Sequence, residues 1–183
     1  VIKNLNFTFK SGTADGAFIY SLKDSQAYNT HGYTHNVTVA DCNFDGAGSE
    51  SFRAVRCPAK GSAKNIILIN VTAKNLFGLA EFRGTIDITI QNCTATENML
   101  YGVQISGGYG THQIENNEFV ATATGAYGIV VQDACSADIT YKNNTITAGR
   151  ALVFKATSSA QDNYVESGIY NGTLEHTGVN NLH

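Results

Sequence analysis

The chain contains short segments in which apolar and polar residues alternate with a period of two. This alternation is typical of β-strands, whose successive side chains point to opposite faces. Six of these segments share one shape, in which an apolar alternation is followed by Asn or Asp and then by a second short alternation. The anchor residues are Asn4, Asp41, Asn70, Asn92, Asn116 and Asn143, at spacings of 37, 29, 22, 24 and 27 residues. The series predicts one structural unit that is repeated with loops of variable length between its copies.

The residues on either side of the anchor predict the shape of the unit. Two residues before it stand Ile2, Val39, Leu68, Ile90, Ile114 and Tyr141, and three residues after it stand Phe7, Phe44, Ala73, Ala95, Phe119 and Ile146. The alternation changes phase across the anchor, so we expect the chain to bend there and keep its apolar side inward. Asn suits this bend because it tolerates the left-handed backbone region, and stacked Asn side chains can hydrogen-bond as a ladder.

A further strand-like segment follows each bend, at residues 17–21, 52–57, 79–84, 102–107, 128–133 and 151–156. Two or three short strands per unit, without a helical period, predict an all-β fold, a parallel β-helix (solenoid) of about six to seven short coils. Helical repeats are disfavoured because the spacing of about 3.6 residues is missing, and a β-sandwich would not align similar residues in columns. We expect residues 1–183 to form a single domain.

Composition and charge narrow the possible functions. With 183 residues, of which 43% are hydrophobic, the chain can bury a real core and is not intrinsically disordered. It has no long apolar run, so no membrane span is expected. A net charge of -3 without a basic stripe disfavours nucleic acid as a partner. The chain opens directly on the strand-like VIKNLNF, which suggests a mature fragment or a domain excised from a longer chain.

The coil motif I-T-I-x-N-C-T-A at 88–95 and its copies resemble the right-handed parallel β-helix (pectate-lyase-like) superfamily over about residues 1–170. This superfamily includes pectate lyases, polygalacturonases, alginate-acting enzymes and surface adhesins. The resemblance implies a right-handed solenoid and makes polysaccharide the expected class of ligand. No specific enzyme family is matched: TADG at 13–16 lacks the second acidic pair of polygalacturonases, and the alginate-epimerase and pectate-lyase motifs are absent. Whether the chain is an enzyme stays open.

Charged residues gather at outward positions of the third strand of the units. Arg56 and Arg83 are placed one coil apart, with Glu81 and Gln104 beside them and Lys155 further along, although the register at Arg56 is open by one residue. Arginine binds carboxylates in a bidentate manner, so we expect these residues to bind an acidic polymer. In an enzyme version, Arg83 or Lys155 neutralises a uronate or acts as the base of a β-elimination, and Glu81 orients it. The alternative is a surface salt bridge worth under about 1 kcal/mol.

Aromatic residues suggest a second part of the same site. Tyr101 and Tyr127 each precede a glycine in matching pairs, and Phe77-Gly78 is a third pair of this kind. Exposed rings in one column would stack on the apolar faces of sugars, and we therefore add Tyr101 and Tyr127 to the expected ligand-binding residues. Buried rings would instead form a stack in the core or at a corner of the coil.

No metal or cofactor is expected, and calcium has no support in the sequence. The segment HGYTH at 31–35 places two histidines in a loop without further ligands. Cys42 and Cys93 share a column but lie two coils apart, roughly 9–10 Å, so the four cysteines are interpreted as free, buried thiols. His112 falls in an inward column and is interpreted as a hydrogen-bonded core histidine.

Two hypotheses for the function remain. The first is a secreted or cell-surface module that binds, or processes as a lyase, an extracellular polysaccharide. The second is a non-catalytic adhesin or structural rod that spaces other domains from a surface. In either case the bare ends of a solenoid expose unpaired strand edges, so we expect flanking domains of the same chain or end-to-end association as partners.

Overall fold

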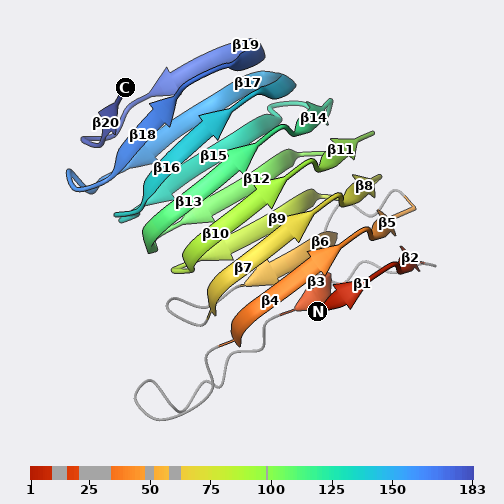
Figure 1. Ribbon diagram of the computed structural model, residues 1–183. Coiled ribbons are helices and arrows are strands. Elements are labelled where there is room, and N and C mark those ends of the chain that lie inside the picture. The colour runs from red at the N-terminus through yellow and green to blue at the C-terminus, as the bar shows by residue number, and fades with distance from the viewer. Residues whose placement is uncertain (10–15, 21–33, 48–51, 58–62, 98) are drawn as a thin grey trace.

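The computed structural model describes residues 1–9, 16–20, 34–47, 52–57, 63–97 and 99–183, and the regular elements in these ranges are all β-strands. The chain winds as a solenoid, and its two termini lie at opposite ends of the rod (Figure 1). Strands of successive coils pair in parallel, for example β7 (Ala63–Ile69) with β10 (Ile86–Gln91) and β9 (Gly78–Arg83) with β12 (Tyr101–Ser106). Along the chain the described strands form seven groups of two or three, followed by the short strand at Asn181–Leu182, which is roughly consistent with the six to seven expected coils. The predicted all-β parallel solenoid is confirmed.

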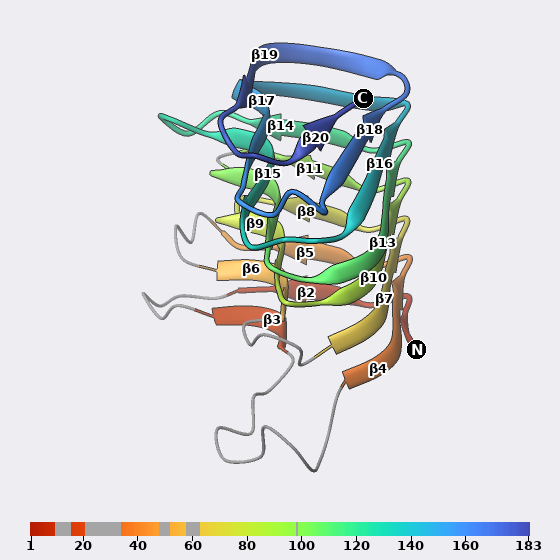
Figure 2. The same ribbon diagram turned by 90° about the vertical axis from the view of Figure 1, so that its left-hand side faces the viewer.

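The strands form three faces around the core, and Figure 2 shows the coils stacked from the bottom to the top of the view. The first face is an eight-stranded sheet of β1 (Ile2–Lys3), β4 (Thr34–Ala40), β7 (Ala63–Ile69), β10 (Ile86–Gln91), β13 (Tyr109–Glu115), β16 (Asp138–Lys142), β18 (Asp162–Val165) and β20 (Asn181–Leu182). The second face contains β2 (Asn6–Thr8), β5 (Asn43–Asp45), β8 (Thr72–Lys74), β11 (Thr94–Thr96) and β14 (Glu118–Ala121). The third face contains β3 (Gly16–Tyr20), β6 (Phe52–Cys57), β9 (Gly78–Arg83), β12 (Tyr101–Ser106) and β15 (Tyr127–Asp133). The long strands β17 (Asn144–Ala156) and β19 (Gly168–His176) turn from the second face into the third and join these two faces into one sheet.

The six anchors form the bend between the first and second faces, as predicted. All six have positive φ, between 52° and 59°, which is the left-handed region that Asn and Asp tolerate. Their side chains form a ladder on the surface: Asn70 Nδ2 donates to Asp41 Oδ1 at 2.9 Å, and Asn143 Nδ2 donates to Asn116 Oδ1 at 3.2 Å. Asn92 Nδ2 donates to Asn70 Oδ1 at 3.4 Å. The predicted asparagine ladder is therefore present.

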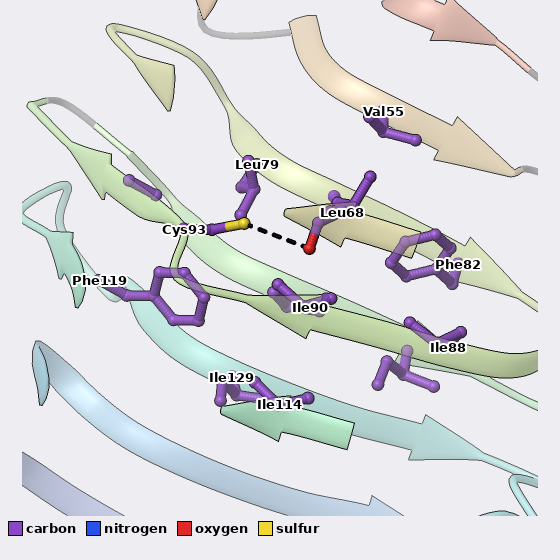
Figure 3. Packing of buried hydrophobic residues seen from close by; sticks show 14 of the residues in the cluster. Val55, Leu68, Leu79, Phe82, Ile88, Ile90, Cys93, Ile114, Phe119 and Ile129 are labelled. Atoms are coloured by element: carbon purple, nitrogen blue, oxygen red, sulfur yellow. Dashed lines mark hydrogen bonds between the residues drawn. The ribbon is translucent and has the colours of Figure 1, made fainter. Parts of the chain in front are cut away.

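A second, buried ladder lies one residue after the anchors. Asn117 Nδ2 donates to the carbonyl of Ile90 at 3.0 Å, and Asn144 Nδ2 donates to that of Ile114 at 2.7 Å. The thiol of Cys93 faces the equivalent carbonyl of Leu68 at 3.7 Å, as the dashed line in Figure 3 shows. The cysteine thus occupies the ladder position and turns its weak S–H donor toward the carbonyl that an amide would bind.

The core consists of apolar columns that run the length of the rod. On the third face, Val55, Ala80, Val103, Ile129 and Leu152 stand opposite one another on successive strands and are almost completely buried. Leu68, Ile90 and Ile114 form the facing column on the first face, and side chains of both columns meet in Figure 3. Because the same inward positions recur in every coil, the burial is continuous from coil to coil.

The two ends of the rod expose apolar side chains. Val1 is 89% exposed at one end, and Ile169 and Val179 are 58% and 65% exposed at the other. Such residues are consistent with the expectation that the ends contact something else, which stays a prediction. No helix in the described part of the chain is long and apolar enough to cross a membrane.

Candidate functional site

The outer surface of the third face holds nearly all of the residues that the sequence nominated. Three outward columns cross it: Arg53, Gly78, Tyr101, Tyr127 and Arg150 form one, Arg56, Glu81, Gln104, Val130 and Val153 form the next, and Arg83, Ser106, Gln132 and Lys155 form the third. This face lies at the left of Figure 2, opposite the strands of the first face.

The register corrects two details of the sequence reading. Arg56 pairs with Glu81 across neighbouring strands, so Arg56 and Arg83 lie in different columns rather than one coil apart in the same column. Tyr101 pairs with Tyr127, as expected, but its partner on β9 is Gly78 and not Phe77. Alternation assigns each residue to a face, but loops of unequal length between the strands leave the pairing open by one or two residues.

The first group of charges, here called the Glu81 cluster, consists of Arg53, Arg56, Glu81, Arg83 and Tyr101. Glu81 Oε2 lies 3.0 Å from the Nε of Arg53 and 3.0 Å from the Nε of Arg56, and its Oε1 accepts the Nε–H of Arg83 at 2.7 Å. Glu81 is 1% exposed, whereas the Arg83 side chain is 46% exposed. Among the described residues, the cluster contains three guanidinium groups and one carboxylate.

Tyr101 belongs to the Glu81 cluster through the contacts of both its ring and its hydroxyl. Its ring lies against Gly78, where an added Cβ would come within 2.1 Å of the ring, and its edge meets Phe77 at a centroid distance of 5.2 Å. Its hydroxyl accepts a hydrogen bond from Arg53 Nε at 2.9 Å and lies 3.4 Å from Glu81 Oε2. Burial raises the pKa of Tyr101, and the arginine beside it opposes that rise. The ring is only 2% exposed, so Tyr101 offers no open face to a sugar.

The second group, here called the Glu175 cluster, lies nearer the C-terminal end of the same face. It consists of Tyr127, Arg150, Lys155 and Glu175. Glu175 accepts from Lys155 Nζ at 3.2 Å and lies 3.6 Å from Arg150 Nε. Arg150 also donates to the hydroxyl of Tyr127 at 2.8 Å, with its guanidinium 5.1 Å from the ring centroid. Unlike the Glu81 cluster, its cations are well exposed, at 42% for Arg150 and 36% for Lys155.

Neutral residues separate the two clusters. Gln104 is half-buried beside Glu81, and Val130, which points outward, is only 5% exposed. Gln132 Nε2 donates to Ser106 Oγ at 3.1 Å. Between the clusters, the column of Ser106 and Gln132 is thus polar, whereas in the neighbouring column Gln104 is followed by the apolar Val130.

The third face is the cationic face of an acidic chain. All four arginines of the sequence lie on its strands. With Lys155 they outnumber the acidic residues of the same strands, which are Glu81, Asp133 and Glu175. The net charge of the whole chain is -3, so the positive charge of this face is set against an excess of negative charge elsewhere.

The structure gathers some of the predicted site residues and separates others. Arg56, Glu81, Arg83 and Tyr101 share one cluster, with Gln104 on its border, whereas Tyr127 and Lys155 belong to the other cluster. Of the three residues considered for catalysis, Glu81 and Arg83 are in contact, but Lys155 pairs with Gln132 and lies three strands away from Arg83. The site residues expected from the sequence did not include Arg53, Arg150 or Glu175, although both arginines stand at the start of a third-face strand.

His112 is a core histidine, as interpreted. Its Nδ1 accepts the N–H of Ile88 at 3.3 Å, where the register of β10 and β13 shifts. Burial lowers its pKa from 6.5 to about 4, so the ring is neutral at pH 7. Its Nε2 has no hydrogen-bond partner among the described residues. The hydrogen-bonded reading thus holds for one of the two ring nitrogens.

All four cysteines are free and buried, which confirms their interpretation. Burial raises the pKa of Cys93 to about 12 and that of Cys135 to about 11, so both are protonated thiols at neutral pH. Within the described ranges, no three His, Cys, Asp or Glu side chains are close enough to hold a metal ion. His31 lies outside the described residues.

Comparison with known proteins identifies the architecture. The family model described as the right-handed beta helix region matches residues 6–173, which is most of the chain. No curated protein and no solved structure shows a significant match. The match covers both clusters of the third face, but it assigns them no activity.

Proposed function

We propose, from the premise that this chain belongs to the right-handed β-helix family, that it binds a linear acidic polysaccharide along the outer surface of its third face. The observation that carries the proposal is the gathering of all four arginines and Lys155 on one face of a chain with net charge -3. A solenoid offers an extended surface to an extended ligand, and guanidinium groups match carboxylates in geometry and charge.

The arrangement favours binding over lyase chemistry. Glu81 is 1% exposed and is in contact with three guanidinium groups, so it is poorly placed to orient a substrate or accept a proton. A β-elimination needs a base and a charge-neutralising group at one sugar. Arg83 and Lys155 lie three strands apart and do not serve the same sugar. The proposal is therefore for a carbohydrate-binding module, at the cell surface or secreted, where such polymers occur.

One observation favours the structural rod as the second candidate. The side chains of Arg53 and Arg56 are only 10% and 11% exposed, and Glu81 ties them to each other. Ion pairs as buried as these join neighbouring strands whether or not a ligand is present. Under this second hypothesis the Glu81 cluster stabilises the third face, and the rod only separates the domains or surfaces that are attached to its ends.

Binding to a panel of polysaccharides separates the two candidates. Polygalacturonate, alginate and hyaluronan are titrated into the protein, with dextran as the uncharged control, and binding is measured by isothermal titration calorimetry. We expect at least one polyuronate to bind, dextran not to bind, and the affinity to fall as NaCl is added. Ultraviolet absorbance of an unsaturated uronate product tests the lyase version in the same samples.

The Arg83→Ala variant supplies the matched test of the site. Because the Arg83 side chain is 46% exposed and Arg53 and Arg56 still pair with Glu81, we expect the variant to lose affinity for the polyuronate while it stays folded, with a melting temperature lower by only about a few degrees. Lack of binding to all three polyuronates by the unmodified chain would contradict the proposal and leave the structural rod.

A further inference from the structure

The two clusters hold exposed cations in line along the rod. Arg83, Ser106, Gln132 and Lys155 occupy one outward column on four successive strands. Neighbouring strands lie about 4.8 Å apart, so the backbones at Arg83 and Lys155 are separated by about 14 Å along the axis. The two residues between them are uncharged and hydrogen-bonded to each other. The column is therefore cationic at two separate points rather than along its length.

The cations at these two points keep surface available for a ligand. The side chain of Arg83 is 46% exposed although its Nε contacts Glu81, and that of Lys155 is 36% exposed although it contacts Glu175. Arg150, which shares Glu175 with Lys155, is 42% exposed. In contrast, Arg53 and Arg56 are about nine-tenths buried and hold Glu81 in place. Each cluster thus offers one outer position, Arg83 in the first and the Lys155–Arg150 pair in the second.

We infer that the acidic polysaccharide runs parallel to the rod axis and is bound at two anionic groups at once, one by Arg83 and the other by Lys155 together with Arg150. This inference rests on the proposed function and adds to it a direction and a minimum length. A chain too short to span about 14 Å reaches only one of the two positions. One exposed ion pair contributes little affinity, whereas two linked contacts reinforce each other through effective concentration.

The strip between the two positions fits an uncharged part of such a polymer. Half-buried Gln132 offers its amide to sugar hydroxyls, whereas Ser106 and Val130 are each only 5% exposed and form the neutral floor of the strip. The ligand class is thus a linear polysaccharide whose carboxylates can reach two points about 14 Å apart. A single uronic acid, or a polymer whose charges are esterified, does not meet this requirement.

A length series tests the inference. The polyuronate that binds most tightly in the panel is prepared as oligomers from the disaccharide to the octasaccharide, and the Kd of each is measured by calorimetry. We expect a step of about 100-fold in affinity at the first oligomer that spans both positions, and only a gradual rise on either side of it. Arg83→Gln removes the step because it leaves only the second position, and the double variant Lys155→Gln/Arg150→Gln removes it because it leaves only the first.

Lys142→Gln is the matched control. Lys142 is a 48% exposed lysine of the first face that contacts Glu166 at 3.3 Å, so its substitution makes the same change in charge away from the third face. We expect it to leave the step in place. All of the variants should remain folded, because the substituted side chains are each more than a third exposed, and Arg83→Gln should lower the melting temperature most, because it loses the 2.7 Å contact with Glu81.

The outcomes separate the inference from the proposed function. A smooth rise of affinity with length, or a step that survives Arg83→Gln or the double variant Lys155→Gln/Arg150→Gln, would overturn the two-point contact and leave polysaccharide binding intact. Failure of every polyuronate to bind the unmodified chain would overturn both.

Discussion

The Glu81 and Glu175 clusters use the same kinds of residue on the same face of the rod, but they differ in burial. Each sets one carboxylate against more than one cation and places a tyrosine hydroxyl beside an arginine. Glu81 is 1% exposed, whereas the side chain of Glu175 is 28% exposed. The same residue types can thus stabilise the fold when they are buried or form an accessible surface when they are exposed. The two clusters differ in how far water is excluded from them.

The physical reason is the cost of removing a charge from water. A buried carboxylate needs its partners, because its own hydration has been lost, whereas an exposed carboxylate exchanges its partners for water at little cost. Arg83 lies between the two cases, since it contacts buried Glu81 and yet remains 46% exposed. For this reason it is the residue of the Glu81 cluster that we assign to the ligand.

Substitution of Glu81 and of Glu175 by glutamine should show the largest difference in stability between the two clusters. We expect Glu81→Gln to lower the free energy of unfolding by about 3–5 kcal/mol, because it removes a buried negative charge from two guanidinium groups that are themselves about nine-tenths buried. We expect Glu175→Gln to lower it by less than about 1 kcal/mol. Urea denaturation at pH 7 measures both. Equal effects would show that the burial of Glu81 has no energetic consequence.

Acid titration measures the contribution of His112 to stability. Because His112 belongs to neither cluster, this contribution can be separated from the effects of the two carboxylates. The pKa of His112 falls from 6.5 to about 4 on folding, so the unfolded chain binds the proton more tightly. The contribution of His112 to the free energy of unfolding is therefore fully present above about pH 6.5. It is lost as the pH falls toward 4, a decrease of about 3 kcal/mol in total. Urea denaturation from pH 7 to pH 4 measures the slope, which we expect to be absent between pH 6.5 and 5 in His112→Leu. A slope retained there by the variant would assign it to other groups.

A methyl group added beside each cluster tests how tightly it is packed. In Gly78→Ala the new Cβ would meet the ring of Tyr101 at 2.1 Å, so we expect a loss of about 1–3 kcal/mol as the ring moves off Arg53 and Glu81. In Gly149→Ala, next to Arg150, the nearest atom is 3.6 Å away, and we expect a change within about 0.5 kcal/mol. Melting temperatures measure both. Similar values for the two variants would contradict the difference in packing.

Removal of the tyrosine hydroxyls has a smaller effect of the same kind. We expect Tyr101→Phe to cost about 1–2 kcal/mol, because it removes a buried acceptor from Arg53 at 2.9 Å. We expect Tyr127→Phe to cost under about 0.5 kcal/mol, because water can replace the hydroxyl at the half-exposed Arg150. Chemical denaturation of the two variants in parallel provides the measurement, and a larger cost for Tyr127→Phe would reverse our assignment of the buried cluster.

Salt produces the smallest of the expected differences. At about 1 M NaCl, ion pairs in contact with water are screened, whereas buried pairs are screened much less. The destabilisation by Glu175→Gln should therefore disappear in salt, and that by Glu81→Gln should largely remain. Repeating the urea experiment at low and high NaCl provides the measurement. Loss of the Glu81→Gln effect in salt would indicate that water reaches this carboxylate.

The sequence by itself determined the architecture. The phase change at Asn70 and its counterparts predicted the bend, the left-handed backbone and the ladder, all of which are present. It could do so because the repeat is local: each unit carries its own alternation and its own anchor, and like residues stack on like residues. The free cysteines and the core position of His112 followed from the same columns.

Tertiary structure alone decided which charged residues meet and how deeply they are buried. The sequence nominated Arg56, Glu81 and Arg83, but it did not place Arg53 and Tyr101 around the same carboxylate, nor Glu175 between Arg150 and Lys155. These contacts join strands that are separated by loops of unequal length, so their register is not set by alternation. Burial depends on every neighbour of a side chain at once, and only the assembled coils supply those neighbours.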